Sequence, residues 1–218
     1  LKEGTKQSHS AAENTKFVSQ FLKGCVDPEE YRKLISNFYY VYSTMEGLIQ
    51  ETTDPLAKVL QQWQKELIRT TGIERDLRYF YGPMWREYAK PSEACNNYCH
   101  RLNEVATDNP YLLIAHHYTR YIGDLSGGVI LRGIAEKALK TNGEGMYFYE
   151  FPYIDDAKAF KNQYRATLDD LPLTVEQQDA IIEEANYAFK LNMDMFNEIK
   201  GSASKSLLKI IWSAIRGK

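Results

Sequence analysis

His9 and Glu13 stand four residues apart near the start of the chain. In a helix this spacing places both side chains on one face. The carboxylate can then accept the imidazole Nδ1–H, directly or through water, which leaves Nε2 free to bind a metal. The same spacing also fits a partly exposed histidine that pairs with a carboxylate on a helix surface. The residues alone therefore make His9 a candidate ligand and leave the second interpretation open.

The other histidines are weaker candidates. A helix turns the adjacent His116 and His117 about 100° apart, so they cannot face one metal together. We expect one of the two to pack in the core and the other to be solvated. His100 lies close to Cys95 and Cys99, but these residues lack the number and spacing of ligands that a zinc site requires.

Three glycines interrupt the helical pattern between Tyr118 and Gly128. Each glycine costs a helix roughly 1 kcal/mol relative to alanine, so such a group needs a reason. Gly123 and Gly127 share one face and Gly128 widens the gap, so a flat molecule could approach the backbone, and a kink is expected. Asp124 would face a confined space, where a carboxylate can organise water. Close packing of two helices through small residues has the same pattern.

Lys161 and Arg165 also stand four residues apart on a predicted helix. Both cations could reach an anion at the helix surface, although a solvated cationic stripe has the same spacing. Farther along the chain, Phe189, Asn192 and Phe196 share one helix face, which is the geometry of a core. The polar Asn192 on such a face needs a hydrogen-bond partner.

Helices must position all of these residues, because apolar residues recur at three- and four-residue spacing along nearly the whole chain. Asp27-Pro28 and Thr174-x-x-Gln177 are typical helix starts. The aromatic segment 147–153 is expected to be a loop anchored by its rings. We therefore predict one all-α domain over residues 1–218, with eight or nine helices near residues 1–17, 28–50, 55–66, 73–90, 92–107, 110–140, 155–170, 174–200 and 203–216.

The composition narrows the class of protein. Of 218 residues, 44% are hydrophobic and 26% are charged, which excludes a disordered chain. The net charge of −2 provides no basic field for nucleic acid. Three cysteines without framework spacing favour a reducing compartment. The expected location is the cytoplasm, or the plastid stroma if a transit peptide has been removed.

No run of apolar residues is long enough for a transmembrane anchor. The segment 203–218 is amphipathic and cationic instead. We expect it to dock on the domain, with peripheral contact to a membrane surface as the alternative.

Five motifs along nearly the whole chain match one known family. They are Lys2-Glu3-x-Thr5-Lys6-x-x-His9-x-x-Ala12-Glu13-Asn14, the segment from Tyr118 to Gly128, Gly143-Glu144-Gly145, Phe160-Lys161-x-x-Tyr164-Arg165, and Glu183-Glu184-Ala185-x-x-Ala188-Phe189-x-Leu191-Asn192. The chain therefore resembles the haem oxygenases, and among them the soluble cyanobacterial and algal enzymes.

The resemblance implies a haem held between a proximal N-terminal helix and a kinked, Gly-rich distal helix. His9 would ligate the haem iron, with Glu13 as its hydrogen-bond partner. Asp124 would order water beside O2, in a network with Arg120, Tyr42 and Asn192. Further residues would line or hold the haem and its propionates: Lys2, Tyr118, Gly123, Ser126, Gly127, Gly128, Lys161, Arg165 and Phe189.

The implied reaction is oxidative cleavage of haem at the α-meso carbon, with haem as both substrate and cofactor. O2 and electrons would give biliverdin IXα, carbon monoxide and ferrous iron. Reduced ferredoxin is the implied electron donor, approached by a basic patch of Lys2, Lys6, Lys161 and Arg165. The product would enter bilin pigment synthesis, with a bilin reductase as the downstream partner.

Two rival classes compete with this interpretation. A haem carrier without activity would typically have lost His9 or Asp124, and both are present. A different helical enzyme, such as a thiamin-salvage hydrolase, needs a nucleophilic cysteine beside paired carboxylates. Cys95 and Cys99 have no such setting in the sequence. Failure to bind haem would favour the second rival.

Overall fold

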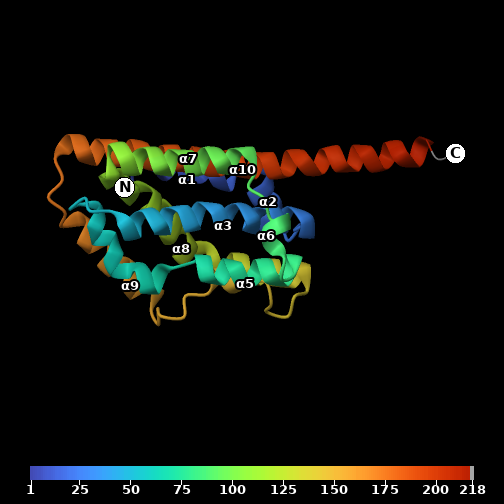
Figure 1. The fold of residues 1–218 in the computed structure, drawn as a ribbon, viewed down its shortest axis with the longest axis horizontal. Helices are drawn as coiled ribbons and strands as arrows, with labels where there is room; N and C mark the ends of the chain where they lie inside the picture. The colour runs from blue at the N-terminus through green and yellow to red at the C-terminus, as the bar shows by residue number, and fades with distance from the viewer. Residues whose placement is uncertain (217–218) are drawn as a thin grey trace.

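A computed structural model describes the backbone of residues 1–216 and the side chains of residues 1–199. Within that range the chain is helical with no strand, as the all-α prediction requires (Figure 1). The elements are α1 (Lys6–Glu13), α2 (Lys16–Leu22), α3 (Pro28–Glu51), η1 (Ala57–Trp63), α4 (Gln64–Leu67), α5 (Thr70–Tyr81), α6 (Trp85–Tyr88), α7 (Glu93–Asp108), η2 (Pro110–Leu112), α8 (Leu113–Leu139), η3 (Tyr147–Tyr149), α9 (Ala157–Asp169) and α10 (Val175–Arg216), where η marks a 3-10 helix.

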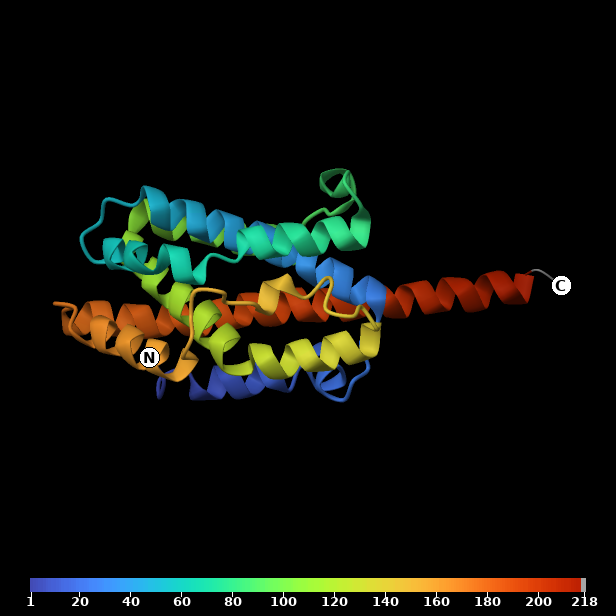
Figure 2. The same cartoon turned by 90° about the horizontal axis from the view of Figure 1, so that it is seen from below.

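The two long helices α3 and α10 organise the packing. α3 contacts α5, α7 and α10, whereas α10 contacts α1, α2, α7 and α8. Figure 2 shows α8 crossing α10 and changing direction near its middle. Residues 123–128 occupy the middle of α8, so the bend coincides with the Gly-rich segment. The bend and α1 lie on the same side of α10 in this view.

The predicted helix starts form through local hydrogen bonds. Asp27 Oδ1 accepts from the backbone N–H groups of Glu29 and Glu30, at 2.9 and 3.0 Å, ahead of α3. At the start of α10, Thr174 Oγ1 accepts from Gln177 N and Gln177 Oε1 accepts from Thr174 N. These contacts satisfy N–H groups that have no partner inside the helix, which is why the start signals were readable in sequence.

Both ends of the chain differ from the prediction. The single helix expected over 1–17 is wrong, because Thr15 adopts extended backbone angles and its Oγ1 accepts from Val18 N as the N-cap of α2. A hydroxyl that bonds nearby backbone groups competes with the helix. At the other end, α10 continues without a break to Arg216, so the expected division near 200–203 is also wrong. Contacts of the segment 203–218 lie outside the described side chains.

Two predicted helices in the middle of the chain differ from the expectation. The segment 55–66 is mostly a 3-10 helix, η1, followed by the single turn of α4. The single helix expected over 73–90 is divided into α5 and the short α6, because Gly82 between them has φ of 79°, in the left-handed region. Glycine adopts that conformation without steric cost and ends α5 there. No helix among the described residues is long and apolar enough to cross a membrane.

The aromatic segment 147–153 is a loop, as predicted, except that it begins with the 3-10 turn η3, and its backbone is held against α5. Its backbone N–H groups at Tyr147 and Phe148 each donate to the Asp76 carboxylate at 2.8 Å. A Cβ on Gly72 would lie 2.7 Å from Tyr147 O, so this close approach requires glycine. Phe148 is buried beneath the loop.

His116 and His117 are both buried, so the expectation that one of them is solvated is wrong. The helix α8 is enclosed by neighbours on more than one face, and each imidazole finds a polar partner there. His117 Nδ1 lies 2.7 Å from the hydroxyl of Tyr164, and the two groups share a hydrogen bond whose donor depends on the tautomer of the imidazole.

Acid is expected to destabilise the fold through His117. Burial lowers the pKa of this imidazole to about 3, whereas the unfolded chain binds a proton with a pKa of about 6.5. The unfolded state therefore holds the extra proton between these values, and the free energy of unfolding falls as the pH decreases from about 6.5. The slope from this residue approaches about 1.4 kcal/mol per pH unit, measurable by urea titration at several pH values.

The matched variants are His117→Gln and His100→Gln, the second at an exposed residue. The expected result is a smaller pH slope, by about one proton, in His117→Gln alone. Equal slopes in both variants and the wild type would show that His117 does not carry this effect.

Candidate functional site

The Gly-rich part of α8 presents bare backbone to open space. A Cβ added at Gly123 or Gly127 would meet no atom of the described residues within 4 Å outside the helix itself. At Gly128 it would lie 3.7 Å from Tyr149. Close packing between helices therefore does not explain Gly123 or Gly127, and the interpretation that a flat molecule approaches α8 is the one that fits.

His9 projects from α1 with its side chain 56% exposed. Its Nδ1 lies 3.7 Å from Glu13 Oε2, which is close enough for an ion pair but longer than a hydrogen bond. The ring of Phe189 on α10 contacts the imidazole edge-on, with centroids 5.8 Å apart. The imidazole is thus oriented by one neighbour and remains accessible to a ligand.

α1 is fixed to α10 by contacts that the sequence analysis missed. The amide of Asn186 accepts from Ser8 Oγ at 2.6 Å and donates to Gly4 O at 3.0 Å. A Cβ on Gly4 would lie 2.6 Å from a methyl group of Ile182, so glycine allows the N-terminus to approach α10. These contacts hold α1, the helix of His9, on the side of α10 where α8 bends (Figure 2).

One hydrogen-bond network contains four of the predicted residues, including Asp124. The Tyr42 hydroxyl donates to Asp124 Oδ2, and Arg120 Nε donates to the Tyr42 oxygen at 3.0 Å. Arg120 also donates to Asn192 Oδ1, and Asn192 Nδ2 donates to Ala188 O at 2.9 Å. Three helices, α3, α8 and α10, thus contribute to the network, and Asn192 has the partner that its place on an apolar face required.

Burial dominates the protonation of this network. It raises the pKa of the Asp124 carboxyl, although the positive charge of Arg120 opposes that rise. Burial also raises the pKa of the Tyr42 hydroxyl well above its ordinary value. Tyr42 therefore stays protonated, and its hydroxyl donates a hydrogen bond to one oxygen of Asp124. The second carboxylate oxygen is left for water.

Two predicted anion-binding cations lie beside the Gly-rich segment. Lys161 Nζ is 3.1 Å from Ser126 Oγ, which brings α9 to the edge of α8. Arg165 NH1 donates to Lys161 O at 3.5 Å, and its Nε is buried without a hydrogen-bond partner among the described residues. The Tyr118 ring lies beside Tyr164. Lys2 is exposed near the N-terminus, and its place in this group stays a prediction.

The sequence analysis missed Glu46 and its partners. This carboxylate accepts from Arg69 N at 2.7 Å, Thr70 Oγ1 at 2.6 Å and Tyr121 OH at 2.9 Å. Burial raises its pKa, and these hydrogen bonds oppose that rise. The contacts attach the start of α5 to α3 and α8. A carboxylate on the apolar face of α3, one residue after Met45, was the available signal.

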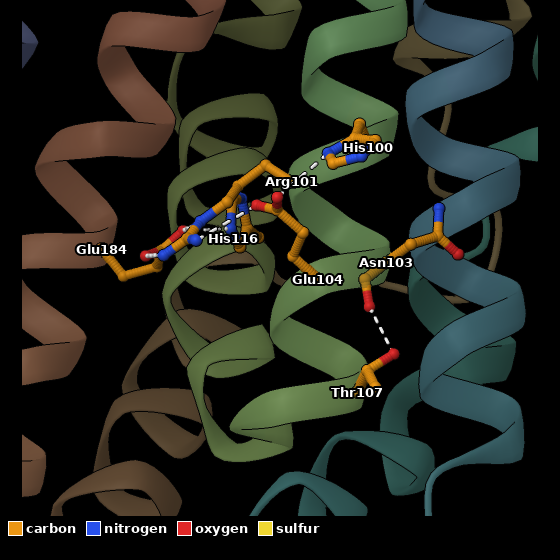
Figure 3. Close-up of polar contacts among 7 residues, drawn as sticks. All are labelled: His100, Arg101, Asn103, Glu104, Thr107, His116 and Glu184. Atoms are coloured by element: carbon orange, nitrogen blue, oxygen red, sulfur yellow. Dashed lines mark hydrogen bonds and ion pairs between the residues drawn. The ribbon is translucent and has the colours of Figure 1, made fainter.

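A second missed cluster surrounds His116. Its Nε2 lies 2.9 Å from Glu184 Oε1, and Arg101 approaches the same carboxylate from α7 through two nitrogens (Figure 3). On the exposed side, Glu104 pairs with Arg101 at 3.2 Å and with His100 at 3.2 Å. The cluster thus links α7, α8 and α10 through charged side chains.

Comparison with known proteins gives a family match over most of the chain. The Heme oxygenase family model matches residues 1–198. The chain is 46% identical over 216 residues to heme oxygenase 1 of Synechocystis sp., covering 99% of this chain and 89% of that protein. It is 47% identical over 218 residues to the heme oxygenase of Porphyra purpurea, covering 99% and 92% of the two chains.

A solved structure has the same arrangement of helices. The crystal structure of heme oxygenase-1 from the cyanobacterium Synechocystis sp., in complex with heme, superimposes with a TM-score of 0.90 at 46% identity. The superposition covers 98% of this chain and 96% of that one. At this level of identity and coverage the likeness extends beyond the fold to the sequence.

Proposed function

The chain belongs to the haem oxygenase family, and we propose that it cleaves haem at the α-meso carbon with O2 and electrons. The products are biliverdin IXα, carbon monoxide and ferrous iron. One observation carries the proposal: α1, which carries the exposed His9, lies on the same side of α10 as the bend of α8, the helix with uncovered backbone at Gly123 and Gly127. Asp124 stands between those glycines with one oxygen left for water.

The residues present fit haem. A flat macrocycle can lie against α8 only where side chains are missing, and a Cβ would enter that space at both glycines. Its propionates would meet Lys161, which reaches Ser126 Oγ on α8, and the guanidinium of Arg165. His9 supplies a neutral nitrogen ligand suited to iron. Haem is the substrate, and its iron supplies the chemistry that activates O2.

His9 would hold the substrate from the proximal side. Glu13, whose Oε2 lies 3.7 Å from Nδ1, would orient the imidazole and favour the tautomer in which Nε2 is free. Phe189 limits the rotation of the ring by its edge-on contact. These contacts keep the ligand nitrogen in one direction without covering it.

On the distal side Asp124 would deliver protons through ordered water. Tyr42 and Arg120 hold one carboxylate oxygen in place, so the other is presented in a fixed position. The glycines put backbone, rather than an acid–base side chain, next to the macrocycle. Water is therefore the nearest proton donor, and Asp124 decides where that water lies.

The cations on α9 would set which meso carbon is attacked. A porphyrin can rotate in its own plane, and fixed partners for its propionates prevent that rotation. Lys161, Arg165, Tyr118 and Lys2 are the residues that we assign to this role. Biliverdin would then pass to a bilin reductase in pigment synthesis, a fate supported by the similarity to cyanobacterial and red algal proteins.

We propose reduced ferredoxin as the electron donor. Lys2 and Lys6 are exposed and, with Lys161 and Arg165, would form a basic patch for an acidic protein. Turnover with ferredoxin should therefore slow by about tenfold or more as salt rises from low ionic strength to about 0.1 M. Initial rates across a salt series measure this, with a small chemical reductant as the control. A rate independent of salt would argue against the patch.

The function is tested by a visible spectrum of the protein with haemin, recorded before and after ferredoxin, its reductase and NADPH are added in air. The expected result is a Soret band that decays into the broad absorbance of biliverdin. A band that persists, with the reductant shown to be competent on a control enzyme, would favour the haem carrier. The absence of any Soret band would contradict both interpretations.

A further inference from the structure

A continuous series of hydrogen bonds leads from Glu184 to the network of Asp124. Glu184 Oε1 contacts His116 Nε2 at 2.9 Å, and the other ring nitrogen, Nδ1, lies 3.3 Å from Tyr98 OH. Tyr98 is hydrogen-bonded to the amide of Asn192, whose oxygen accepts from Arg120. His116 and Tyr98, the two middle members of this series, have no exposed surface.

The charges at Glu184 determine where the protons lie. Burial alone would raise the pKa of this carboxyl, but hydrogen bonds from His116 and Arg101 outweigh burial and lower it to about 2. Burial also lowers the pKa of His116, against the influence of Glu184. At neutral pH an ionised carboxylate thus faces a neutral imidazole. A carboxylate can only accept, so Nε2 carries the ring proton.

This tautomer of His116 fixes which group donates in each hydrogen bond between His116 and Arg120. His116 Nδ1 has no proton and accepts from the Tyr98 hydroxyl. The Tyr98 oxygen then accepts from the Asn192 amide nitrogen, which turns the amide oxygen toward Arg120. Arg120 can only donate, so this orientation of Asn192 is the one that holds it.

We propose that Glu184 is a positioning residue, which acts through His116 and Tyr98 to fix Asn192 and Arg120 in the orientation that holds Tyr42 against Asp124. The inference rests on the proposed function, because the position of Asp124 matters only if it orders water for haem cleavage. In the opposite tautomer, His116 Nδ1 would donate to Tyr98. The Tyr98 hydrogen would then point at the Asn192 amide, and the amide would turn its NH2 group toward Arg120.

Because of Arg101, the substitution Glu184→Gln is expected to change the tautomer of His116. Arg101 donates to both oxygens of Glu184, at 3.0 and 2.6 Å. The shorter of these bonds reaches Oε2, whereas Oε1 is shared by Arg101 Nε and His116. In Glu184→Gln we therefore expect the carbonyl oxygen to keep the Oε2 position, so that the NH2 group of the new side chain faces His116. Nε2 must then accept, so His116 is forced into the opposite tautomer. Adding Arg101→Met frees the glutamine oxygen for His116 and should restore the original tautomer.

The first measurement is a two-dimensional 1H–15N spectrum of the imidazoles in the haem-free, full-length protein. The chain has four histidines, so loss of one signal in His116→Gln assigns His116. We expect the Nε2–H tautomer in the wild type, the Nδ1–H tautomer in Glu184→Gln, and the Nε2–H tautomer again in Glu184→Gln/Arg101→Met. Glu104→Gln is the matched control, because Glu104 contacts Arg101 but lies 43% exposed; its spectrum should match the wild type.

The second measurement is biliverdin formed per haem consumed. Glu184→Gln should lower it by about tenfold, since a small displacement of a catalytic group costs up to about 10²-fold. The Arg101→Met double variant should recover most of it, and Glu104→Gln should stay within about twofold of the wild type. Tyr98→Phe removes the connection, so Glu184→Gln should have little further effect in that background.

The outcomes separate the inference from the proposed function. An unchanged His116 tautomer in Glu184→Gln overturns the inference, and so does a reversed tautomer with wild-type biliverdin yield. If the wild type itself forms no biliverdin, the proposed function fails, while the tautomer experiment on the haem-free protein still reports on Glu184. Loss of yield without rescue by Arg101→Met would indicate a purely structural role and would also overturn the inference.

Discussion

Replacing Asp124 with alanine is expected to leave haem bound and to lower the rate of biliverdin formation by about 10²-fold or more. The carboxylate is the group that Tyr42 and Arg120 hold in place, and its second oxygen is left for water. Without it the water has no fixed position, and the activated oxygen is lost to other products. Single-turnover spectra with haemin measure both haem binding and biliverdin formation, because bound haem and biliverdin absorb at different wavelengths.

The fold should survive this substitution. Burial raises the pKa of the Asp124 carboxyl, with Arg120 opposing, so the folded state gains little from the ionised form. Thermal unfolding of the haem-free variant checks that point. Asp124→Asn keeps the shape and one acceptor oxygen, and we expect an intermediate rate. Biliverdin formation at the wild-type rate in Asp124→Ala would refute the assigned role.

Replacing His9 with alanine is expected to abolish iron ligation and to reduce turnover by at least about 10²-fold. Loss of only the hydrogen-bond partner of a metal ligand already costs up to about 10²-fold, and here the ligand itself is lost. Haem should still associate through the cations of α9, with an altered Soret band. The side chain is 56% exposed, so the variant leaves an accessible space for a small ligand. Added imidazole should therefore restore part of the native spectrum and of the turnover.

His100→Ala is the matched control for this variant. His100 also precedes a glutamate by four residues, and its Nδ1 lies 3.2 Å from Glu104. It belongs to α7 and lies with Glu104 on the exposed side of the His116 cluster (Figure 3). Turnover in His100→Ala should equal that of the wild type. A similar loss in both variants would mean that His9 is not the ligand.

These two histidines show where sequence reasoning stops. His9 with Glu13 and His100 with Glu104 have identical spacing, and local geometry in fact gives the shorter distance to the second pair. Spacing selects side chains on one helix face but carries no information about what that face meets. Only the motif around His9 favoured it in sequence, and only the packing of α1 against α10 shows what lies beside it.

The buried carboxylates were missed for a related reason. Glu46 and Glu184 look like ordinary surface residues of amphipathic helices, because helices usually carry charge on their exposed sides. Their partners come from other helices: Arg69 and Thr70 for the first, His116 and Arg101 for the second. No local pattern predicts a pair that is tens of residues apart in the chain.

The sequence by itself determined what depends on neighbouring residues. Helical periodicity established the all-α class, Asp27 and the Thr174–Gln177 pair marked helix starts, and the glycines of α8 marked exposed backbone. Tertiary structure decided the rest: the burial of both His116 and His117, and the joining of Tyr42 to Asp124 across 82 positions. Caps and glycine conformations arise within a few residues, whereas a buried polar group must bond to whatever side chain the packing brings to it.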